Sequence, residues 1–521
     1  MNGAESLVHT LLDGGVEVCF TNPGTSEMHF VAALDRVPGM RCVLGLFEGV
    51  VTGAADGYYR MTDHPAATLL HLGPGLGNGL ANLHNARKAR SGIVNVVGDH
   101  ATAHLALDAP LTSDIAGIAR PMSHWVQRSA SADDVARDGR EAIVQARARP
   151  SRIATLILPA DAAWSPVTTE RARLGPVPEA AAEPLDETPL AAAAEALRTD
   201  GPGTLLLLGD RALRERATRW AGRIAAATGC GVMAAFYGAR LERGAGRVAI
   251  PRLPYAVEPA LAALARWRRI VLVGASDPVA FFAYPGKPGR LAPPGCELLP
   301  LATPVHDAEA TLEALADRLG ARRVAYAGVP RASTVTPPDD APLNPATLGA
   351  LLAAVMPEGA VVVDEAVSTG RGFDALTAGA APHDWLTGMG GSIGFGLPAA
   401  VGAAIGAPGR RVIALSGDGS AMYTPQALWT MARENLDVTV VIFANHAYQI
   451  LRGEFAGVGA GEPGQRATDM LVLDRPRLDW QALARGHGLP ATRVATPDAL
   501  ADALRRSFAT PGPSLLEVVL A

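Results

Sequence analysis

Two polar residues at the ends of neighbouring strand-like runs could together hold a metal ion. Asp418 follows an apolar run in RRVIALSGDGS (410–420), and Asn445 ends VTVVIFAN (438–445), 27 residues further along. The helical pattern PQALWTMAREN lies between them, and a strand–helix–strand unit brings the carboxyl ends of two parallel strands to one sheet edge. One anionic and one neutral oxygen there suit Mg²⁺, which takes its other ligands from phosphate and water.

The glycines around these ligands predict a diphosphate beside the metal. Gly417 and Gly419 would let the backbone approach phosphate closely. Upstream, GMGGSIGFGLPAAVG (388–402) opens a helix with small residues, whose unpaired N–H groups would receive phosphate oxygens. An Asp-Gly turn and an unrelated loop asparagine are the alternative interpretation.

The N-terminal third offers a carboxyl and a histidine for proton transfer. Glu48 stands where a strand ends and a helix begins, in LGLFEGVVTGAADGYYR (44–60). An apolar setting would raise its pKa toward neutrality, whereas a helix N-terminus also favours any acidic residue. His71 ends the run AATLLH before a glycine loop and is an acid/base candidate, with a purely structural role as the alternative.

Composition restricts the functions open to the chain. Its 521 residues suggest about three domains, and 49% hydrophobic with 19% charged residues excludes a largely disordered chain. The net charge of −5 without a long basic block argues against nucleic-acid or anionic-membrane binding. The four cysteines are scattered, so we propose neither a disulfide framework nor a zinc site.

No basic-then-apolar leader opens the chain, and we expect a cytoplasmic protein with no membrane association. The weakly polar stretch 392–409 contains several glycines and Pro398, so a buried helix is a better interpretation than a membrane span. The spacing of Gly402 and Gly406 then predicts close packing against another helix.

Apolar runs alternate with helical patterns from end to end, which predicts an α/β fold with three doubly wound parallel-sheet domains. Proline-rich linkers at 175–190 and 329–345 divide the chain into domains at 1–170, 185–325 and 340–521. The clearest strand runs are VEVCFTN, RCVLG, AATLLH, SGIVNVVGD, ATLILP, TLLLLGD, RIVLVG, AVVVDEA, RRVIALSG, VTVVIFAN and SLLEVVL.

These motifs resemble those of the thiamine diphosphate-dependent 2-oxo acid decarboxylase and acetolactate synthase superfamily, in particular its benzoylformate decarboxylase branch. GDGS followed by FANHAY is similar to the family's metal motif, with Ala444 in place of the first asparagine of a pair. EGVVTGAADGYYR is similar to its cofactor-activating glutamate segment. The resemblance spans essentially the whole chain and implies a pyrimidine-binding domain, a central Rossmann-like domain and a diphosphate- and Mg²⁺-binding domain, in that order.

The resemblance also implies roles for individual residues. Mg²⁺ would be held by Asp418, Asn445 and the carbonyl of Ala447, and Glu48 would activate the cofactor. In the family, the glutamate comes from one subunit and the diphosphate site from its partner, which implies a homodimer at least, and a homotetramer. The implied cofactor-binding residues are Glu48, Ser368, Gly391, Ser392, Ile393, Gly417, Asp418, Gly419, Ser420, Asn445, Ala447 and Tyr448.

On the substrate side, TNPGTSEMHF resembles the family segment with a substrate-binding serine, which falls on Thr25. HLGPGLGN resembles the loop that carries a catalytic histidine, which falls on His71, and APLTSD resembles a pocket wall with an apolar contact at Leu111. The implied catalytic residues are Glu48, His71 and Thr25. The implied substrate pocket contains Thr25, Ser26, His71, Leu111, Phe281, Phe282, Ile450 and Leu451.

Two departures from that branch bear on the reaction. A second catalytic histidine is missing from ASDPVAFFAYPG (275–286), where Phe281 or Phe282 would stand instead. Slower protonation or release would then favour carbon–carbon bond formation. Ile450 replaces a smaller residue and should narrow the pocket, which favours a small aliphatic 2-oxo acid.

We therefore expect thiamine diphosphate- and Mg²⁺-dependent decarboxylation of a 2-oxo acid, or carboligation with an aldehyde or keto acid, or both. Acetolactate synthase is the alternative, although Pro110, Leu111 and Thr112 stand where that enzyme carries Phe-Gln-Glu and its flavin signatures are not found. A non-catalytic scaffold and a flavin-dependent oxidase are further alternatives. The donor, the acceptor and a nucleotide in the central domain stay open, and we interpret His100 and His124 as structural.

Overall fold

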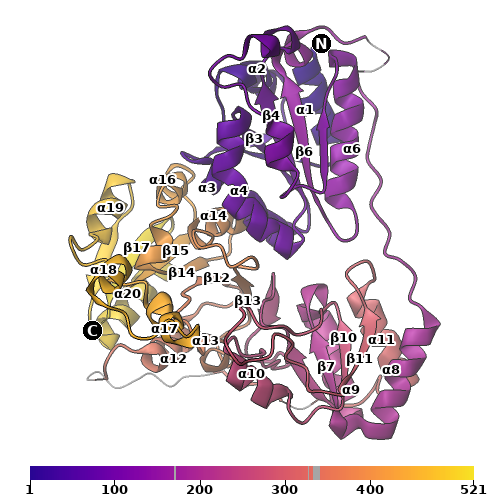
Figure 1. The fold of residues 1–521 in the computed structure, drawn as a ribbon, viewed down its shortest axis with the longest axis vertical. Coiled ribbons are helices and arrows are strands. Elements are labelled where there is room, and N and C mark those ends of the chain that lie inside the picture. Colours follow the sequence, from indigo (N-terminus) through magenta and orange to yellow (C-terminus); the bar gives the residue numbers. More distant parts are fainter. Residues whose placement is uncertain (169, 171, 327, 333–340, 521) are drawn as a thin grey trace.

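The structure is a computed structural model and describes residues 1–520, apart from 169, 171, 327 and 333–340. Its strands form three sheets of six, four and seven strands, each with helices packed on its faces (Figure 1). Among the described residues, every pairing between the strands of these sheets is parallel except one. The predicted α/β class is confirmed. The middle of the predicted linker at 329–345 lies outside the described residues.

The first sheet has the order β2-β1-β3-β4-β6-β5 and is buried on both faces. Helices α1, α2, α6 and α7 cover one face, and α3, α4 and α5 cover the other. Its strands are β1 (Val18–Asn22), β2 (Arg41–Leu44), β3 (Ala66–Leu70), β4 (Ile93–Asp99), β5 (Trp125–Arg128) and β6 (Ile153–Pro159). Its helices are α1 (Gly3–Asp13), α2 (Met28–Arg36), α3 (Glu48–Thr62), α4 (Leu72–Ala89), α5 (Ile115–Ala119), α6 (Val135–Arg147) and α7 (Ala160–Trp164).

The central sheet has the order β11-β10-β7-β8. Helices α8, α9 and α11 cover one face, and α10 covers the other. Its strands are β7 (Thr204–Leu208), β8 (Gly231–Ala234), β10 (Arg269–Val273) and β11 (Glu297–Ala302). Its helices are α8 (Glu187–Asp200), α9 (Glu215–Thr228), α10 (Val257–Leu264) and α11 (Ala308–Arg318).

The third sheet has the order β16-β17-β15-β14-β12-β13-β9. Its strands are β9 (Leu241–Arg243), β12 (Val361–Glu365), β13 (His383–Thr387), β14 (Val412–Gly417), β15 (Val438–Ala444), β16 (Ala491–Val494) and β17 (Ser514–Val519). Its helices are α12 (Pro345–Val355), α13 (Phe373–Leu376), α14 (Gly396–Gly406), α15 (Asp418–Ala421), α16 (Ala427–Arg433), α17 (Gln449–Gly457), α18 (Gln465–Leu471), α19 (Trp480–Gly486) and α20 (Pro497–Ala509).

Strand β9 crosses a predicted domain boundary. It lies within the range 185–325 but pairs with β13, antiparallel, at the edge of the third sheet. We keep 1–170, 185–325 and 340–521 as proposed domains, with β9 as an arm of the central one.

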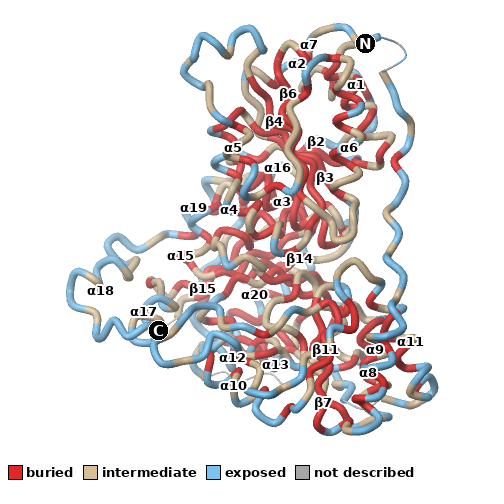
Figure 2. The backbone as a smooth tube through the Cα atoms, turned by 45° about the vertical axis from the view of Figure 1, so that its right-hand side comes forward, coloured by how far each residue is buried: buried red, intermediate tan, exposed pale blue. Residues whose placement is uncertain are grey.

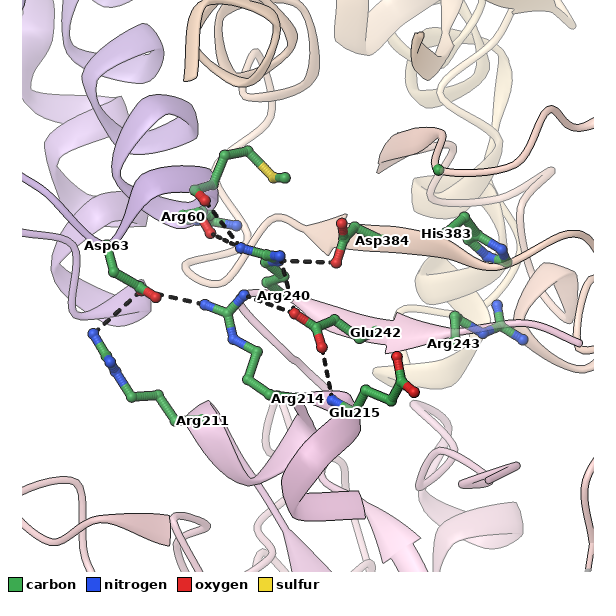
Figure 3. Close-up of polar contacts among 12 residues, drawn as sticks. Arg60, Asp63, Arg211, Arg214, Glu215, Arg240, Glu242, Arg243, His383 and Asp384 are labelled. Atoms are coloured by element: carbon green, nitrogen blue, oxygen red, sulfur yellow. Dashed lines mark hydrogen bonds and ion pairs between the residues drawn. The ribbon is translucent and has the colours of Figure 1, made fainter. Parts of the chain in front are cut away.

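A polar network joins the three sheets where β9 begins (Figure 3). The guanidinium of Arg240 lies 2.9 Å from Asp384 of β13 and donates to the carbonyl of Met61 in α3, at 3.0 Å. Asp63, just after α3, forms ion pairs with Arg211 and Arg214 of the central unit, at 3.2 and 3.3 Å. The orientation of the first and third units is thereby tied to the central one.

Helices α3 and α14 join the first and third units into one core. Backbone at Gly402 approaches α3 so closely that a β-carbon there would lie 1.8 Å from the carbonyl oxygen of Ala54. Gly406 also packs against α3, so the predicted close packing of this glycine pair is confirmed. Figure 2 shows the buried backbone continuing from the first unit into the third. In the part of the chain that the structure describes, no helix is long and apolar enough to cross a membrane.

Candidate active site

A cavity of about 420 Å³ lies between the third unit and the central one. Its walls include the carboxyl ends of β12, β14 and β15 and the aromatic loops of the central unit. Most of the residues that the sequence singles out in the C-terminal two thirds line it. They are Phe281, Phe282, Ser368, Gly391, Ser392, Ile393, Gly417, Asp418, Gly419, Ser420, Asn445, Ala447, Tyr448, Ile450 and Leu451.

The expected metal ligands meet at one edge of the third sheet. Strands β14 and β15 are parallel neighbours, as predicted, and Asp418 and Asn445 follow directly after them. The carboxylate of Asp418 is almost fully buried and accepts hydrogen bonds from the N–H groups of Gly419 and His446, at 2.9 and 2.8 Å. Burial raises the pKa of Asp418, with these hydrogen bonds acting in the opposite direction, and a cation would favour its charged form.

The segment after β15 carries two neutral oxygens at the same edge of the sheet: the side-chain oxygen of Asn445, which accepts the N–H of Ala447 at 3.1 Å, and the carbonyl of Ala447. His446 adopts a left-handed backbone conformation (φ +53°), which turns the chain sharply between Asn445 and Ala447. The backbone N–H of Tyr448 donates to the carbonyl of Leu471, and the N–H of Leu473 donates to the carbonyl of His446. These hydrogen bonds hold the turn and do not involve the Ala447 carbonyl. A carboxylate, an amide oxygen and a backbone carbonyl form a donor set that suits Mg²⁺.

Of the glycines beside the ligands, Gly417 leaves its backbone open to the cavity, whereas aromatic rings cover Gly391 and Gly419. A β-carbon at Gly417 would meet no atom within 4 Å, whereas one at Gly391, where φ is +73°, would lie 2.5 Å from the ring of Phe281. A β-carbon at Gly419 would lie 2.7 Å from the ring of Tyr448, so this ring covers the glycine. The open backbone and the oxygen donors fit a diphosphate bound through Mg²⁺.

The expected phosphate contacts at the start of α14 are not available. The helix begins only at Gly396, and the N–H of Phe395 already donates to the carboxyl group of Glu365, at 2.6 Å. Ser416 donates to the same carboxyl group, at 3.0 Å. Glu365 therefore takes the place that the sequence assigned to phosphate. Burial raises its pKa to about 7, although these hydrogen bonds lower it.

Helix α4 of the first unit holds the loop that precedes α14. The Asn85 side chain is fully buried. Its amide nitrogen donates to the carbonyl of Ser392, at 2.9 Å, and its amide oxygen accepts the N–H of Ser392, at 3.2 Å. Asn82 donates to the carbonyl of Gly394, and a ring nitrogen of His84 lies 3.1 Å from the carbonyl oxygen of Gly390. These three side chains were not predicted, because their partners lie more than 300 residues away.

Glu48 lies at the start of α3, directly beyond β2, as predicted. Its side chain is buried, and the amide of Asn78 donates to its Oε2 atom, at 3.0 Å. The setting is thus less apolar than the sequence suggested, since Asn78 in the HLGPGLGN segment provides a polar partner. This amide would hold the carboxyl group in one orientation.

His71 follows β3 and pairs with a residue that the sequence analysis missed. Its Nδ1 atom lies 2.7 Å from Oε2 of Glu27, which is almost fully buried and also accepts the N–H of Gly24, at 2.7 Å. Burial raises the pKa of Glu27, and His71 acts against that rise. A β-carbon at Gly24 would lie 2.2 Å from the imidazole, so a glycine is needed there. The sequence signal that could have revealed this pair is the NPG segment followed closely by the acidic residue Glu27.

The segment after His71 also differs from expectation. Its glycines do not form a loop, because α4 begins at Leu72 and contains them. Thr25 and Ser26 lie in a 3₁₀ turn (Thr25–Glu27) after β1, with Thr25 exposed. Leu111 is 39% exposed, on a segment that touches the start of α4 through Ser113.

The predicted residues therefore form two groups. Those of the third and central units line the 420 Å³ cavity, whereas Thr25, Ser26, Glu48, His71 and Leu111 of the first unit are not among its walls. Thr25, Ser26, Glu48 and His71 follow the carboxyl ends of β1, β2 and β3, which are adjacent in the sheet, whereas Leu111 lies on the segment between β4 and α5. Within one chain the two halves of the expected site are separate.

Two family models match the chain. Residues 1–127 match the model described as thiamine pyrophosphate enzyme, N-terminal TPP binding domain, and residues 373–518 match the corresponding C-terminal TPP binding domain.

Two curated proteins are similar over almost their whole length. One, from Mycobacterium tuberculosis and named "Putative acetolactate synthase large subunit IlvX", is 53% identical over 100% of this chain and 99% of its own. Benzoylformate decarboxylase of Pseudomonas aeruginosa is 32% identical over 97% of this chain and 96% of its own.

A solved structure shares the fold over the whole chain. The thiamine diphosphate-dependent 4-hydroxybenzoylformate decarboxylase of Rhodococcus jostii RHA1 superposes with a TM-score of 0.85 at 28% identity, covering 100% of this chain and 99% of that one.

Proposed function

The chain belongs to the thiamine pyrophosphate enzyme family, in its decarboxylase and acetolactate synthase-like group, and we propose that it decarboxylates a 2-oxo acid with Mg²⁺ and ligates the product to an aldehyde or keto acid. The observation that carries this proposal is the meeting of Asp418, Asn445 and Ala447 in a cavity with an open glycine backbone. Thiamine diphosphate supplies the electron sink for loss of CO₂ when it is bound.

The third unit would hold the cofactor by its diphosphate. Asp418, Asn445 and the Ala447 carbonyl would bind Mg²⁺, and Ser368 and Ser420 on the cavity wall would donate to phosphate oxygens. Ile393 lies on the same wall, where it would support the thiazolium ring. The clamp of Asn82, His84 and Asn85 fixes the loop that carries Ile393.

The first unit would act on the cavity of a second subunit. Glu48 is buried in its own chain's first unit, outside that chain's cavity, so a homodimer supplies the arrangement in which Glu48 reaches a cofactor. Asn78 would orient this carboxyl group for proton exchange. Glu27 would hold Nδ1 of His71, leaving Nε2 to exchange a proton, with Thr25 and Leu111 beside it.

Acetolactate synthesis is the second candidate, and the 53% identity to a protein of that name favours it. Phe281 and Phe282 line the cavity, and the sequence comparison places them where a second catalytic histidine would speed product release. Two apolar rings in its place would slow that release, which favours ligation. Leu111 and Thr112 in the first unit still differ from the stretch that the synthase carries.

The purified enzyme with thiamine diphosphate and Mg²⁺ should be incubated with a panel of 2-oxo acids, with and without aldehydes, while both CO₂ and acyloin are measured. We expect CO₂ release together with an acyloin, and Glu48→Gln should retain cofactor and Mg²⁺ binding but lose turnover. Turnover equal to the wild type in Glu48→Gln would contradict the assigned role. Failure to bind thiamine diphosphate would favour a scaffold, and a yellow protein would favour a flavin-dependent oxidase.

A further inference from the structure

Aromatic rings from the central unit form one wall of the 420 Å³ cavity. Tyr255 contacts the rings of Phe236 and Phe281, with centroids 5.3 and 5.6 Å apart, and Tyr237 contacts the same two rings, at 4.3 and 5.8 Å. Phe281 also packs directly on Gly391 of the cofactor loop. The wall therefore begins beside the cofactor loop and extends away from it.

Two arginines stand on this aromatic wall and line the cavity. The guanidinium carbon of Arg371 lies 5.8 Å from the ring centroid of Tyr255, and that of Arg252 lies 5.3 Å from the centroid of Phe236. A guanidinium on an aromatic ring keeps its N–H groups free for a planar anion. The contacts from Gly391 through Phe281 and Tyr255 to Arg371 place this cation at the far end of the wall.

None of the cavity's own acids forms an ion pair with this cation. Of its four carboxyl groups, Asp364 accepts from Ala366 and Trp385, Glu365 and Asp418 accept the donors described above, and Glu454 accepts from Tyr284. Arg252 lies 4.0 Å from Asp374. Among the described residues, Arg371 has no carboxylate within 4.0 Å, and it is an exposed residue that lines the cavity.

We propose that Arg371, with Arg252 on the neighbouring ring, binds a second carboxylate of the substrate, so that the preferred 2-oxo acid is an aliphatic dicarboxylate. This inference rests on the proposed function and deepens it. Ile450 and Leu451 give the cavity an aliphatic wall, against which a methylene chain between the reacting 2-oxo group and a terminal carboxylate would pack. A planar carboxylate matches the fork of a guanidinium.

Matched substrate pairs test the proposal on the holoenzyme. 2-Oxopentanoate and 2-oxoglutarate have the same five-carbon chain and differ only in the second carboxylate, and 2-oxohexanoate and 2-oxoadipate form a longer pair. We expect kcat/KM to favour a diacid by at least tenfold in the wild type. Arg371→Met should reduce that preference at least tenfold, mainly through KM, and Arg371→Lys should restore part of it.

Arg266→Met is the matched control, because Arg266 also lies on an aromatic ring, 4.1 Å from Trp267, but outside the cavity. It should keep the wild-type preference. A wild type without a preference for either diacid, or an Arg371→Met variant that keeps its preference, would overturn the proposal. An equal loss on monoacids and diacids, together with weaker thiamine diphosphate binding, would assign Arg371 to the diphosphate instead and would also overturn it.

A binding measurement separates this inference from the proposed function. Glutarate and pentanoate carry no 2-oxo group, so their affinity for the holoenzyme, measured by calorimetry, does not depend on turnover. We expect tighter binding of glutarate, lost in Arg371→Met and kept in Arg266→Met. Glutarate binding without turnover of any 2-oxo acid would refute the proposed reaction alone, whereas turnover of monoacids without glutarate binding would refute only the second-carboxylate site.

Discussion

Glu365 lies at the cofactor end of the cavity, under the start of α14, and its carboxyl group accepts hydrogen bonds from Phe395 and Ser416. Burial outweighs these hydrogen bonds, and the pKa of Glu365 rises from 4.5 to about 7. The folded protein therefore holds this proton more tightly than the unfolded chain does. Stability from this group is present below pH 4.5 and falls as the pH rises to about 7.

Replacing Glu365 by Gln should remove this pH dependence. Between pH 4.5 and pH 7, we expect the free energy of unfolding of the wild-type apoprotein to fall by about 3 kcal/mol relative to Glu365→Gln. Urea titrations of both proteins at several pH values measure it, and the contribution of Asp418 is common to both. Parallel curves would show that Glu365 does not carry the effect.

Glu27 should act as a positioning residue for His71. Glu27→Gln keeps a hydrogen-bonding side chain but removes the carboxylate that holds Nδ1, so kcat should fall about 10- to 100-fold and the pH profile of kcat should shift. The affinity for thiamine diphosphate should stay at the wild-type value. Glu17→Gln, on the exposed surface, is the control. An unchanged pH profile in Glu27→Gln would contradict the role.

At the residue scale, the sequence pointed to candidate site residues more readily than to their hydrogen-bond partners. Asp418 and Asn445 could be found because each stands at the end of an apolar strand run. Glu27 and Asn85 could not, since their partners His71 and Ser392 come close only through long-range folding. Glu365 was missed because an acidic side chain beside a phosphate site is unexpected until its burial is known.

At the element scale, α3 and α14 set how the first and third units meet. They pack tightly at Gly402, where any β-carbon would overlap the backbone oxygen of Ala54. Continuous apolar runs identified the central strands of all three sheets. Short strands such as β5, β9 and β16 went unpredicted, since they are partly exposed and have no continuous apolar run.

Gly402→Ala should destabilise the protein by about 1–3 kcal/mol, because backbone of α3 must move to accept the new methyl group. Gly406→Ala is the matched control in the same helix, since its nearest contact is the side chain of Thr62, at 3.0 Å. Thermal unfolding of the two variants compares them directly. Equal melting temperatures would contradict the close contact.

At the scale of the whole molecule, one chain contains two half-sites. The cavity of the third unit has the oxygen donors but none of the first-unit residues on its walls, whereas Glu48 and His71 lie on the first unit. Exposed apolar side chains lie close in sequence to residues of both halves, among them Met28, Leu46, Leu107, Tyr423 and Leu451. Two chains related by a twofold axis could complete two sites and cover these side chains at once.

Co-expression of two inactive variants tests this sharing most directly. Glu48→Gln damages only the first-unit half and Asp418→Ala only the metal half, so each homodimer should be inactive. In a mixed dimer of shared sites, one site collects both changes and the other is intact, which restores about a quarter of the wild-type activity for random pairing. Sites contained within single chains would leave the mixture as inactive as the two variants alone, and that result would contradict the account.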